Sequence, residues 1–208
     1  MSIALGSHDA HHRGTLAMRG VVKLAATCLL GALIGLVTAY LAVTGRIDLA
    51  SQSKGQWIVW PSAGTPQVDP YTRAHFLFRG RLPISHFEAI EFEARTDDDG
   101  RALDGSCVYS VSGTQPRVRW WGLSALPIET GEVAEDARGG TLLSRRAVYE
   151  PDGSFRATVS PQARPGNWLK PAAAGPMALV FRVYNPEPQL RQSPLSVELP
   201  SVRRGDCL

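Results

Sequence analysis

The fold is decided by the run MALVFRV at residues 177–183, in which every second side chain is large and apolar. Successive side chains of a β-strand point to opposite faces, so this period of two predicts a strand with one buried face. The same alternation recurs along the chain, at Ile90, Phe92 and Ala94, at Cys107, Tyr109 and Val111, at Phe155, Ala157 and Val159, and at Leu195, Val197 and Leu199.

Turn-forming dipeptides separate these runs, at Asp99-Gly100, Asp104-Gly105, Thr130-Gly131, Asp152-Gly153 and Asn185-Pro186. Many short strands joined by such turns are typical of a two-layered all-β domain. The sequence therefore predicts a mainly β, jelly-roll-like β-sandwich of at least seven strands. Carboxylates that alternate with the apolar residues, such as Glu91 and Glu93, are expected on a solvated face rather than as an acid–base pair.

One short helix is predicted near residues 70–79. Asp69 can cap its first turn, Pro70 suits its first position, and Gly80 ends it. We expect its buried face to be formed by Tyr71, Ala74, His75 and Phe78.

Charge and cysteine content argue against two classes of protein, general nucleic-acid binders and disulfide-dense scaffolds. The chain has 208 residues and a formal net charge of +3, with no long basic stretch, which argues against general nucleic-acid binding. Three cysteines are too few for a disulfide-dense scaffold. Residues 51–208 carry 18 basic and 17 acidic side chains, so this part is nearly neutral.

An apolar segment precedes the β-rich part. Residues 24–43, LAATCLLGALIGLVTAYLAV, contain no charge and are long enough to cross a bilayer as a helix. A cleaved signal peptide is the alternative, but its apolar region is usually shorter, so a retained anchor is favoured. The expected organisation is a tail over 1–23, a transmembrane helix over 24–43, a tether over 44–56 and an exported domain over 57–208.

The flanking charges predict the orientation of that helix. Arg13, Arg19 and Lys23 precede it, which favours a cytoplasmic N-terminus. An excess of Arg over Lys, 19 to 3, fits a bacterial protein and hence a periplasmic domain at the inner membrane. Gly31 and Gly35 form a GxxxG pair that allows, without requiring, helix association. His8, His11 and His12 are expected to belong to a solvated tail.

Tryptophan and arginine gather in the run RVRWW at residues 117–121. Adjacent Trp120 and Trp121 must point to opposite faces of a strand, so one can fill the core while the other stands beside Arg117 and Arg119. An exposed Trp flanked by Arg could stack on a sugar or contact a protein. Burial of both rings, by strand packing, a covering loop or the helix, is nevertheless favoured. Trp168 is a further candidate contact.

Other motifs point away from metal and catalytic sites. The acidic stretch Asp97–Gly100, followed by Asp104, lacks the ligand spacing of an EF-hand and is expected to be a solvated turn. No nucleophile elbow, zinc-protease motif or phosphate loop is present. We therefore expect no cofactor and no metal, and a non-catalytic role is favoured over an enzyme.

The cysteines predict a disulfide. Cys28 lies in the apolar segment, whereas Cys107 and Cys207 both fall in the exported part, where oxidising conditions allow a bond. Such a bond would pin the C-terminal tail, which would otherwise fray. Free thiols and intermolecular bonds are the alternatives.

The order of several motifs resembles a known family. These motifs are DPYTRAHFLFRG from residue 69, PRVRWWGLSAL from 116, PDGSFRATVS from 151, GNWLKP from 166 and MALVFRVYNPEP from 177. Together they are similar to the family called domain of unknown function 1214, over residues 55–200. The resemblance implies a jelly-roll-like sandwich and no established activity, cofactor or catalytic residue. Members resemble the C-terminal part of longer proteins that carry a second domain, numbered 1254, in whose place this sequence has an apolar segment.

Two functions remain open at this point. The first is an interaction module anchored in the inner membrane, whose partners are the bilayer through residues 24–43 and an envelope protein or a second copy of the chain. The second is a carbohydrate-binding or carbohydrate-active domain that uses Trp121 or Trp168 as a stacking platform. An exposed Trp over a cleft with convergent polar groups distinguishes the second from the first.

Overall fold

The structure is a computed structural model that describes residues 8–44, 46–47, 49–128 and 140–207. The chain divides into two units, Met1–Leu41 and Ala42–Leu208, each described here by itself. The predicted turn at Thr130-Gly131 lies outside the described residues.

The first unit is formed by the long helix α1, His8–Val43. Its stretch Met18–Val43 is apolar and long enough to cross a membrane, and none of the window that qualifies is buried within the chain. The uncharged residues 24–43 lie inside that stretch, and the helix continues N-terminally through Arg19 and Lys23. The expected tail is therefore helical from His8 onward. The side chains of His8, His11 and His12 are outside the described set.

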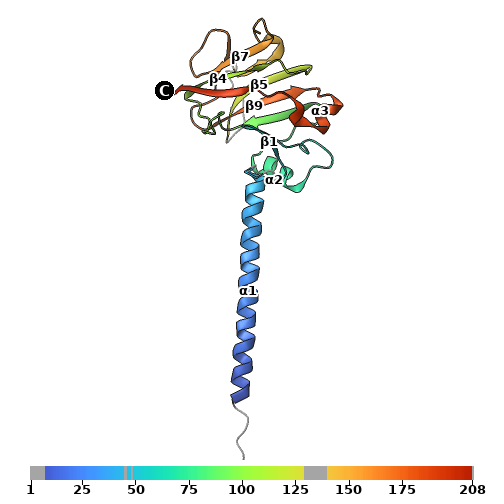
Figure 1. Cartoon of the computed structure of the whole chain (residues 1–208), viewed down its shortest axis with the longest axis vertical. Coiled ribbons are helices and arrows are strands. Elements are labelled where there is room, and N and C mark those ends of the chain that lie inside the picture. The colour runs from blue at the N-terminus through green and yellow to red at the C-terminus, as the bar shows by residue number, and fades with distance from the viewer. Residues whose placement is uncertain (1–7, 45, 48, 129–139, 208) are drawn as a thin grey trace, which may run out of the picture. The chain divides into compact units, whose positions relative to one another are not determined.

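The second unit is a two-layered β-sandwich, as the alternating pattern predicts (Figure 1). One sheet has six strands in the order β1-β2-β3-β9-β5-β6, and the other has four in the order β10-β4-β7-β8. All neighbours are antiparallel except β7 and β8. The six-stranded sheet comprises β1 Gln52–Lys54, β2 Trp57–Val59, β3 Ala89–Ala94, β9 Met177–Tyr184, β5 Trp120–Pro127 and β6 Thr141–Leu143. The four-stranded sheet comprises β10 Ser201–Cys207, β4 Cys107–Thr114, β7 Ser154–Val159 and β8 Asn167–Leu169.

The core lies between the two sheets and is formed by the inward positions that the sequence indicates. Alternate residues of β3, β4, β7 and β9 are buried there, among them Phe92, Tyr109, Phe155 and Phe181. Burial of such aromatic and aliphatic side chains is the main favourable contribution to folding.

Helix α2, Pro70–Phe78, confirms the predicted capping. The Asp69 carboxylate accepts hydrogen bonds from the backbone N–H groups of Tyr71 and Thr72, both at 2.9 Å. After Phe78 the chain turns at Gly80, which has a φ of +60° that suits glycine. The predicted face is only partly correct, because His75 alone of its four residues is buried. Thr72, His75 and Phe76 are the buried residues, while Tyr71 and Phe78 are exposed.

Two boundaries differ from the expectation. The tether is shorter than 44–56 because residues 52–54 already form β1 and pair with β2. The run LSVEL at residues 195–199 is not a strand, because a 3₁₀ turn, η2 at Pro194–Ser196, interrupts it. The last strand is β10, built from the tail that the predicted disulfide was expected to pin. Two further short elements are η1, Ser144–Arg146, and α3, Pro188–Gln192.

Candidate functional site

Trp120 and Trp121 lie on opposite faces of β5, as their adjacency requires. Trp121 is only 1% exposed and packs against Phe155 and Phe181, with ring centroids 4.5 and 5.4 Å away. The expectation that Trp121 contacts a ligand or partner is therefore wrong, because the core between the sheets holds its ring.

Trp120 is the tryptophan that faces outward, with 52% of its surface exposed. It begins β5 and pairs across the sheet with Tyr184 at the end of β9. The exposed arginines Arg117 and Arg119 precede it in the loop between β4 and β5. The expectation that both rings are buried is therefore wrong for Trp120, whose exposed indole follows two exposed arginines.

A groove begins directly beside this tryptophan. It has a volume of about 530 Å³, and its walls are formed by the loop at residues 114–119 and by the segment at 185–198. We call it the Arg117 groove. Arg119 lines it and is followed by Trp120, while Asn185 lines it and follows Tyr184, the cross-strand partner of Trp120. Trp120 therefore stands next to the groove.

Backbone geometry holds the far wall of the groove. Asn185 has a φ of +48°, and its N–H donates to the carbonyl oxygen of Glu88 at 2.8 Å. Asn tolerates this left-handed conformation better than most residues. Beyond it, Arg191 Nη1 donates to the carbonyl oxygen of Pro186 at 2.6 Å, which closes the turn into α3.

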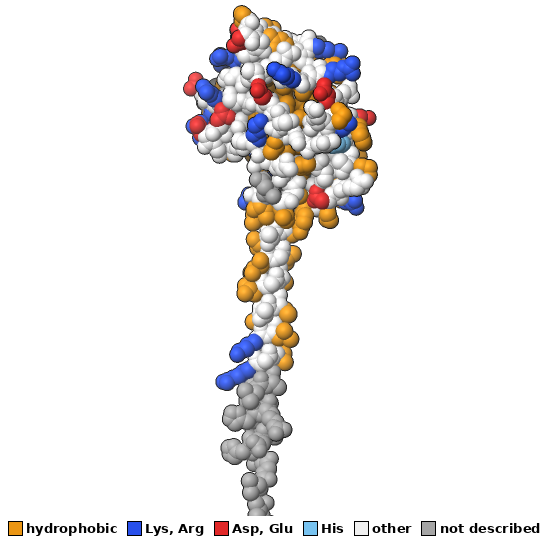
Figure 2. Space-filling model, turned by 45° about the vertical axis from the view of Figure 1, so that its right-hand side comes forward, with side chains coloured by type: hydrophobic (Ala, Val, Ile, Leu, Met, Phe, Trp, Pro, Cys, Tyr) orange, Lys and Arg blue, Asp and Glu red, His pale blue; other side chains and the backbone are white. Residues whose placement is uncertain are grey.

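The groove presents hydrogen-bond donors and acceptors together. Arg117 and Arg119 lie on one wall, and Glu187 lies on the other. Glu198 also lines it, and its carboxylate accepts a hydrogen bond from the Thr114 hydroxyl. Basic and acidic side chains are likewise interspersed over the sandwich face seen in Figure 2. The groove suits a ligand or partner surface with both polarities and does not resemble a site for a bare phosphate.

Trp168 contributes less than the sequence suggests. Its side chain is half-buried, and its indole N–H donates to the carbonyl oxygen of Ser160 at 2.9 Å. It lies on β8, away from the groove-lining segments. The structure therefore does not bring Trp168 together with Trp120 and the two arginines.

Glu91 and Glu93 lie on the outer face of β3 but are not solvated as expected. Glu93 is 6% exposed and accepts hydrogen bonds from Arg79 at 2.9 Å and from Arg95 at 2.6 Å. Glu91 forms an ion pair with Arg182 on the neighbouring strand β9. The segment that contains α2 covers this face. Carboxylates occupied by guanidinium groups are not free to act as a general base.

A small cavity of about 30 Å³ adjoins these carboxylates. Trp60, Phe76, Arg81 and Glu93 are among the side chains that line it. This volume is sufficient for about one or two water molecules and not for a substrate of ordinary size. Four arginines surround Glu91 and Glu93, namely Arg79, Arg81, Arg95 and Arg182. The sequence does not predict this cluster, because only the fold brings these arginines together.

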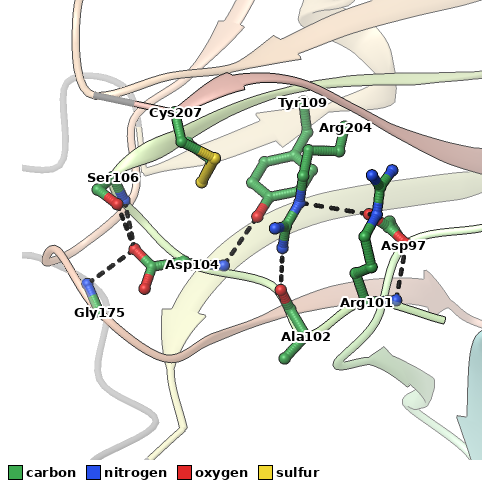
Figure 3. The surroundings of a disulfide bond; sticks show 10 residues. Asp97, Arg101, Ala102, Asp104, Ser106, Tyr109, Gly175, Arg204 and Cys207 are labelled. Atoms are coloured by element: carbon green, nitrogen blue, oxygen red, sulfur yellow. Dashed lines mark hydrogen bonds and ion pairs between the residues drawn. A yellow bond between two sulfur atoms is a disulfide. The ribbon is translucent and has the colours of Figure 1, made fainter. Parts of the chain in front are cut away.

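The acidic stretch at 97–100 fastens the C-terminal strand. Asp97 is buried and accepts hydrogen bonds from the backbone N–H groups of Asp99 and Arg101, and it is paired with Arg204 of β10 at 3.3 Å (Figure 3). Burial alone would raise the pKa of Asp97, but these hydrogen bonds and the Arg101 guanidinium outweigh it and lower the pKa. Asp98, Asp99 and Gly100 are exposed, as expected of a solvated turn, whereas Asp97 is buried. No group of three His, Cys, Asp or Glu side chains that could hold a metal ion occurs in the described residues.

The predicted disulfide joins Cys107 of β4 to Cys207 of β10, with Cα atoms 3.9 Å apart. Figure 3 shows the network beside it, in which Asp104 accepts hydrogen bonds from Ser106 and Gly175. Tyr109 contributes through its hydroxyl, which accepts from the Asp104 N–H at 2.8 Å.

Three residues that the sequence analysis singled out lie in the apolar helix α1. Gly31 and Gly35 have no heavy atom within 4 Å of an added Cβ, and Cys28 is a free, exposed thiol. Association through Gly31 and Gly35 stays a prediction.

Comparison with known proteins finds a family model that matches part of the sandwich, and it assigns no activity. No curated protein matches the sequence. In solved structures, the VPA0106 protein from Vibrio parahaemolyticus aligns with a TM-score of 0.54 and 20% identity over 67% of this chain and 36% of that one. A putative uncharacterized protein from Burkholderia cenocepacia aligns with a TM-score of 0.46 and 18% identity over 82% of this chain and 40% of that one. The chain thus spans well under half the length of either.

The first alignment supports the sandwich fold, and at such identity it supports the fold alone. The family model described as "Protein of unknown function (DUF1214)" matches residues 88–188, from the residue before β3 to the start of α3. That match agrees with the resemblance carried by the RWWGL, GNWL and FRVYNP motifs. Residues 88–188 of the β-sandwich therefore match the DUF1214 family model, and the sandwich resembles that family.

Proposed function

We propose that this chain is a single-pass, membrane-anchored interaction module of the bacterial envelope, whose periplasmic β-sandwich binds a protein partner through Trp120, Arg117 and Arg119. The observation that carries the proposal is the exposure of Trp120. Its large apolar ring is left 52% exposed to water, directly after two exposed arginines that line a groove of about 530 Å³.

The residue types at this surface support a protein partner. Trp and Arg are the residue types most enriched among those that dominate binding energy in protein interfaces. The polar Arg117 groove would supply the surrounding contacts, with its carboxylates and guanidinium groups selecting a partner of matching charge pattern.

The proposed compartment follows from three independent features. The apolar stretch Met18–Val43 qualifies as a membrane span, and the basic residues before residues 24–43 favour a cytoplasmic N-terminus. The disulfide between Cys107 and Cys207 is of a kind that persists in oxidising compartments such as the periplasm.

The test is crosslinking of the full chain in native bacterial membranes, followed by affinity capture under denaturing conditions. We expect a defined protein adduct that is lost in Trp120→Ala and in the double variant Arg117→Glu/Arg119→Glu. Arg145→Glu is the matched control, because Arg145 is equally exposed but lies in η1, outside the groove. Adducts that all variants form equally would overturn the proposal.

A second candidate is binding of an envelope carbohydrate. The specific observation in its favour is the combination of an exposed indole ring with a groove that offers both hydrogen-bond donors and acceptors. A sugar can stack its apolar face on an aromatic ring while its hydroxyl groups form hydrogen bonds with such polar groups. Titration of the full chain in nanodiscs with soluble cell-wall glycan fragments tests it. Saturable binding that Trp120→Ala abolishes would favour the carbohydrate over the protein partner.

A further inference from the structure

A second exposed apolar surface is formed by the end of α2 and the turn after it. Leu77, Phe78 and Leu82 are 67%, 82% and 88% exposed. We call these three residues the α2 patch. They lie within six positions of one another in the sequence, on either side of the turn at Gly80. Several exposed large apolar side chains in one short segment mark a contact surface more often than an isolated exposed residue does.

The α2 patch is not a by-product of how α2 packs. The helix buries Thr72, His75 and Phe76, and Asp69 caps it. Its buried face is therefore formed without Leu77 and Phe78. Water is an unfavourable environment for these two apolar side chains.

A contact within the second unit places α2 where the chain leaves the apolar segment. Val43 is the last residue of that segment and belongs to the second unit. Its carbonyl oxygen lies 2.5 Å from Nδ1 of His75, in the middle of α2. The His75 ring is in turn stacked on Trp60, with centroids 3.9 Å apart. Helix α2 is thus tied to the residue at which the membrane-spanning stretch ends.

A basic side chain lies beside the patch. Between Asp69 and Glu88 the sequence contains no acidic residue but contains Arg73, Arg79 and Arg81. Arg79 and Arg81 are paired with Glu93 and Glu91, whereas Arg73 is exposed. Exposed apolar side chains with a basic residue on the same short helix are typical of segments that lie in the bilayer interface.

We propose that the α2 patch inserts into the interface of the lipid bilayer in which the chain is anchored. Leu77, Phe78 and Leu82 would contact acyl chains, and Arg73 would lie among the headgroup phosphates. This inference goes beyond the proposed binding role of Trp120 and does not depend on it, because it concerns different residues and a different occupant. It also holds for either orientation of the anchor.

The test is site-specific photocrosslinking in the full chain. Benzoylphenylalanine replaces Phe78 or Leu82, and the same group at Val148 is the control, since Val148 is 65% exposed and lies outside this segment. Native membranes are irradiated and the labelled peptides are analysed by mass. Formation of the disulfide in each variant verifies folding.

We expect lipid adducts at positions 78 and 82 in at least tenfold excess over position 148. In nanodiscs that contain phosphatidylglycerol, Arg73→Glu should lower the lipid adduct at position 78 by about threefold, and an unchanged yield would contradict the headgroup role. Protein adducts without lipid adducts at 78 and 82 would identify the patch as a protein interface and overturn the proposal. Equal lipid yields at 78, 82 and 148 would also overturn it.

Discussion

Cys207 is paired directly across the four-stranded sheet with Cys107 and bonded to it, although 100 residues separate them in the sequence. The bond ties the polar tail to β4, along whose edge the tail runs as the antiparallel strand β10. The adjoining turn strengthens the arrangement, because Asp98 and Val202 exchange two hydrogen bonds of 2.9 Å each. The C-terminus is thus part of the sandwich and not an appendage.

The first prediction concerns this bond. Cys107→Ser should lower the free energy of unfolding of the oxidised chain by about 4–5 kcal/mol, the value that the chain-entropy model gives for a loop of roughly 100 residues. Thermal unfolding of oxidised and reduced protein checks it. The difference should vanish once the wild type is reduced, and Cys28→Ser should behave as wild type. Equal stability of Cys107→Ser and oxidised wild type would contradict the prediction.

The second prediction concerns topology. A reporter enzyme that is active only in the periplasm should be active when fused to the C-terminus of the full chain, because the basic residues before the apolar helix favour a cytoplasmic N-terminus. A cytoplasm-only reporter should be silent at the same position. Activity of the cytoplasmic reporter would show that the orientation is reversed.

The third prediction concerns the pH dependence of stability. Burial lowers the pKa of His75 from 6.5 to about 4, and the nearby Arg79 and Arg81 act in the same direction, although the hydrogen bond with the Val43 carbonyl opposes them. The unfolded chain therefore takes up the proton first as the pH falls. The free energy of unfolding should decrease between pH 6.5 and 4, by up to about 3 kcal/mol.

Denaturant unfolding across this pH range measures the effect. His75→Phe should flatten the dependence, whereas His86→Asn should retain most of it. A slope that is the same in wild type and His75→Phe would rule out His75 as its source.

The fourth prediction concerns the buried Glu93. Glu93→Ala leaves Arg79 and Arg95 without their carboxylate partner and should cost about 3 kcal/mol of unfolding free energy. Glu150→Ala is the control, because Glu150 is exposed and its removal should change stability by less than about 0.5 kcal/mol. Comparison of denaturant midpoints decides the point. Equal effects of the two substitutions on the free energy of unfolding would contradict the ion pairs of Glu93 with Arg79 and Arg95.

Features that depend on local pattern were predictable from sequence. The alternation at Phe92, Phe155 and Phe181 identifies inward positions, and Asp69 followed by Pro70 marks the start of α2, because neighbouring residues alone decide these features. The disulfide was predictable from compartment and from the number of cysteines. Strand β10 was not, since its polar tail has few inward apolar residues and is held by partners on β4.

Features that depend on juxtaposition were not predictable. The adjacency of Trp120 and Trp121 places them on opposite faces, but which ring is buried depends on where the second sheet packs. Glu93 looks like a solvent-facing strand residue until α2 covers that face and Arg79 and Arg95 converge on it. Likewise, the ion pair between Asp97 and Arg204 cannot be predicted from the sequence, because the two residues lie more than 100 positions apart.

The most direct test of the central claim is the dissociation constant of the captured partner for the full chain in nanodiscs, compared between wild type and Trp120→Ala. Because an interfacial Trp commonly contributes 2 kcal/mol or more, the account predicts that binding by Trp120→Ala is weaker by at least about thirtyfold. Arg145→Glu should bind as wild type does. Equal dissociation constants for wild type and Trp120→Ala would contradict the claim that this exposed tryptophan is the centre of the binding surface.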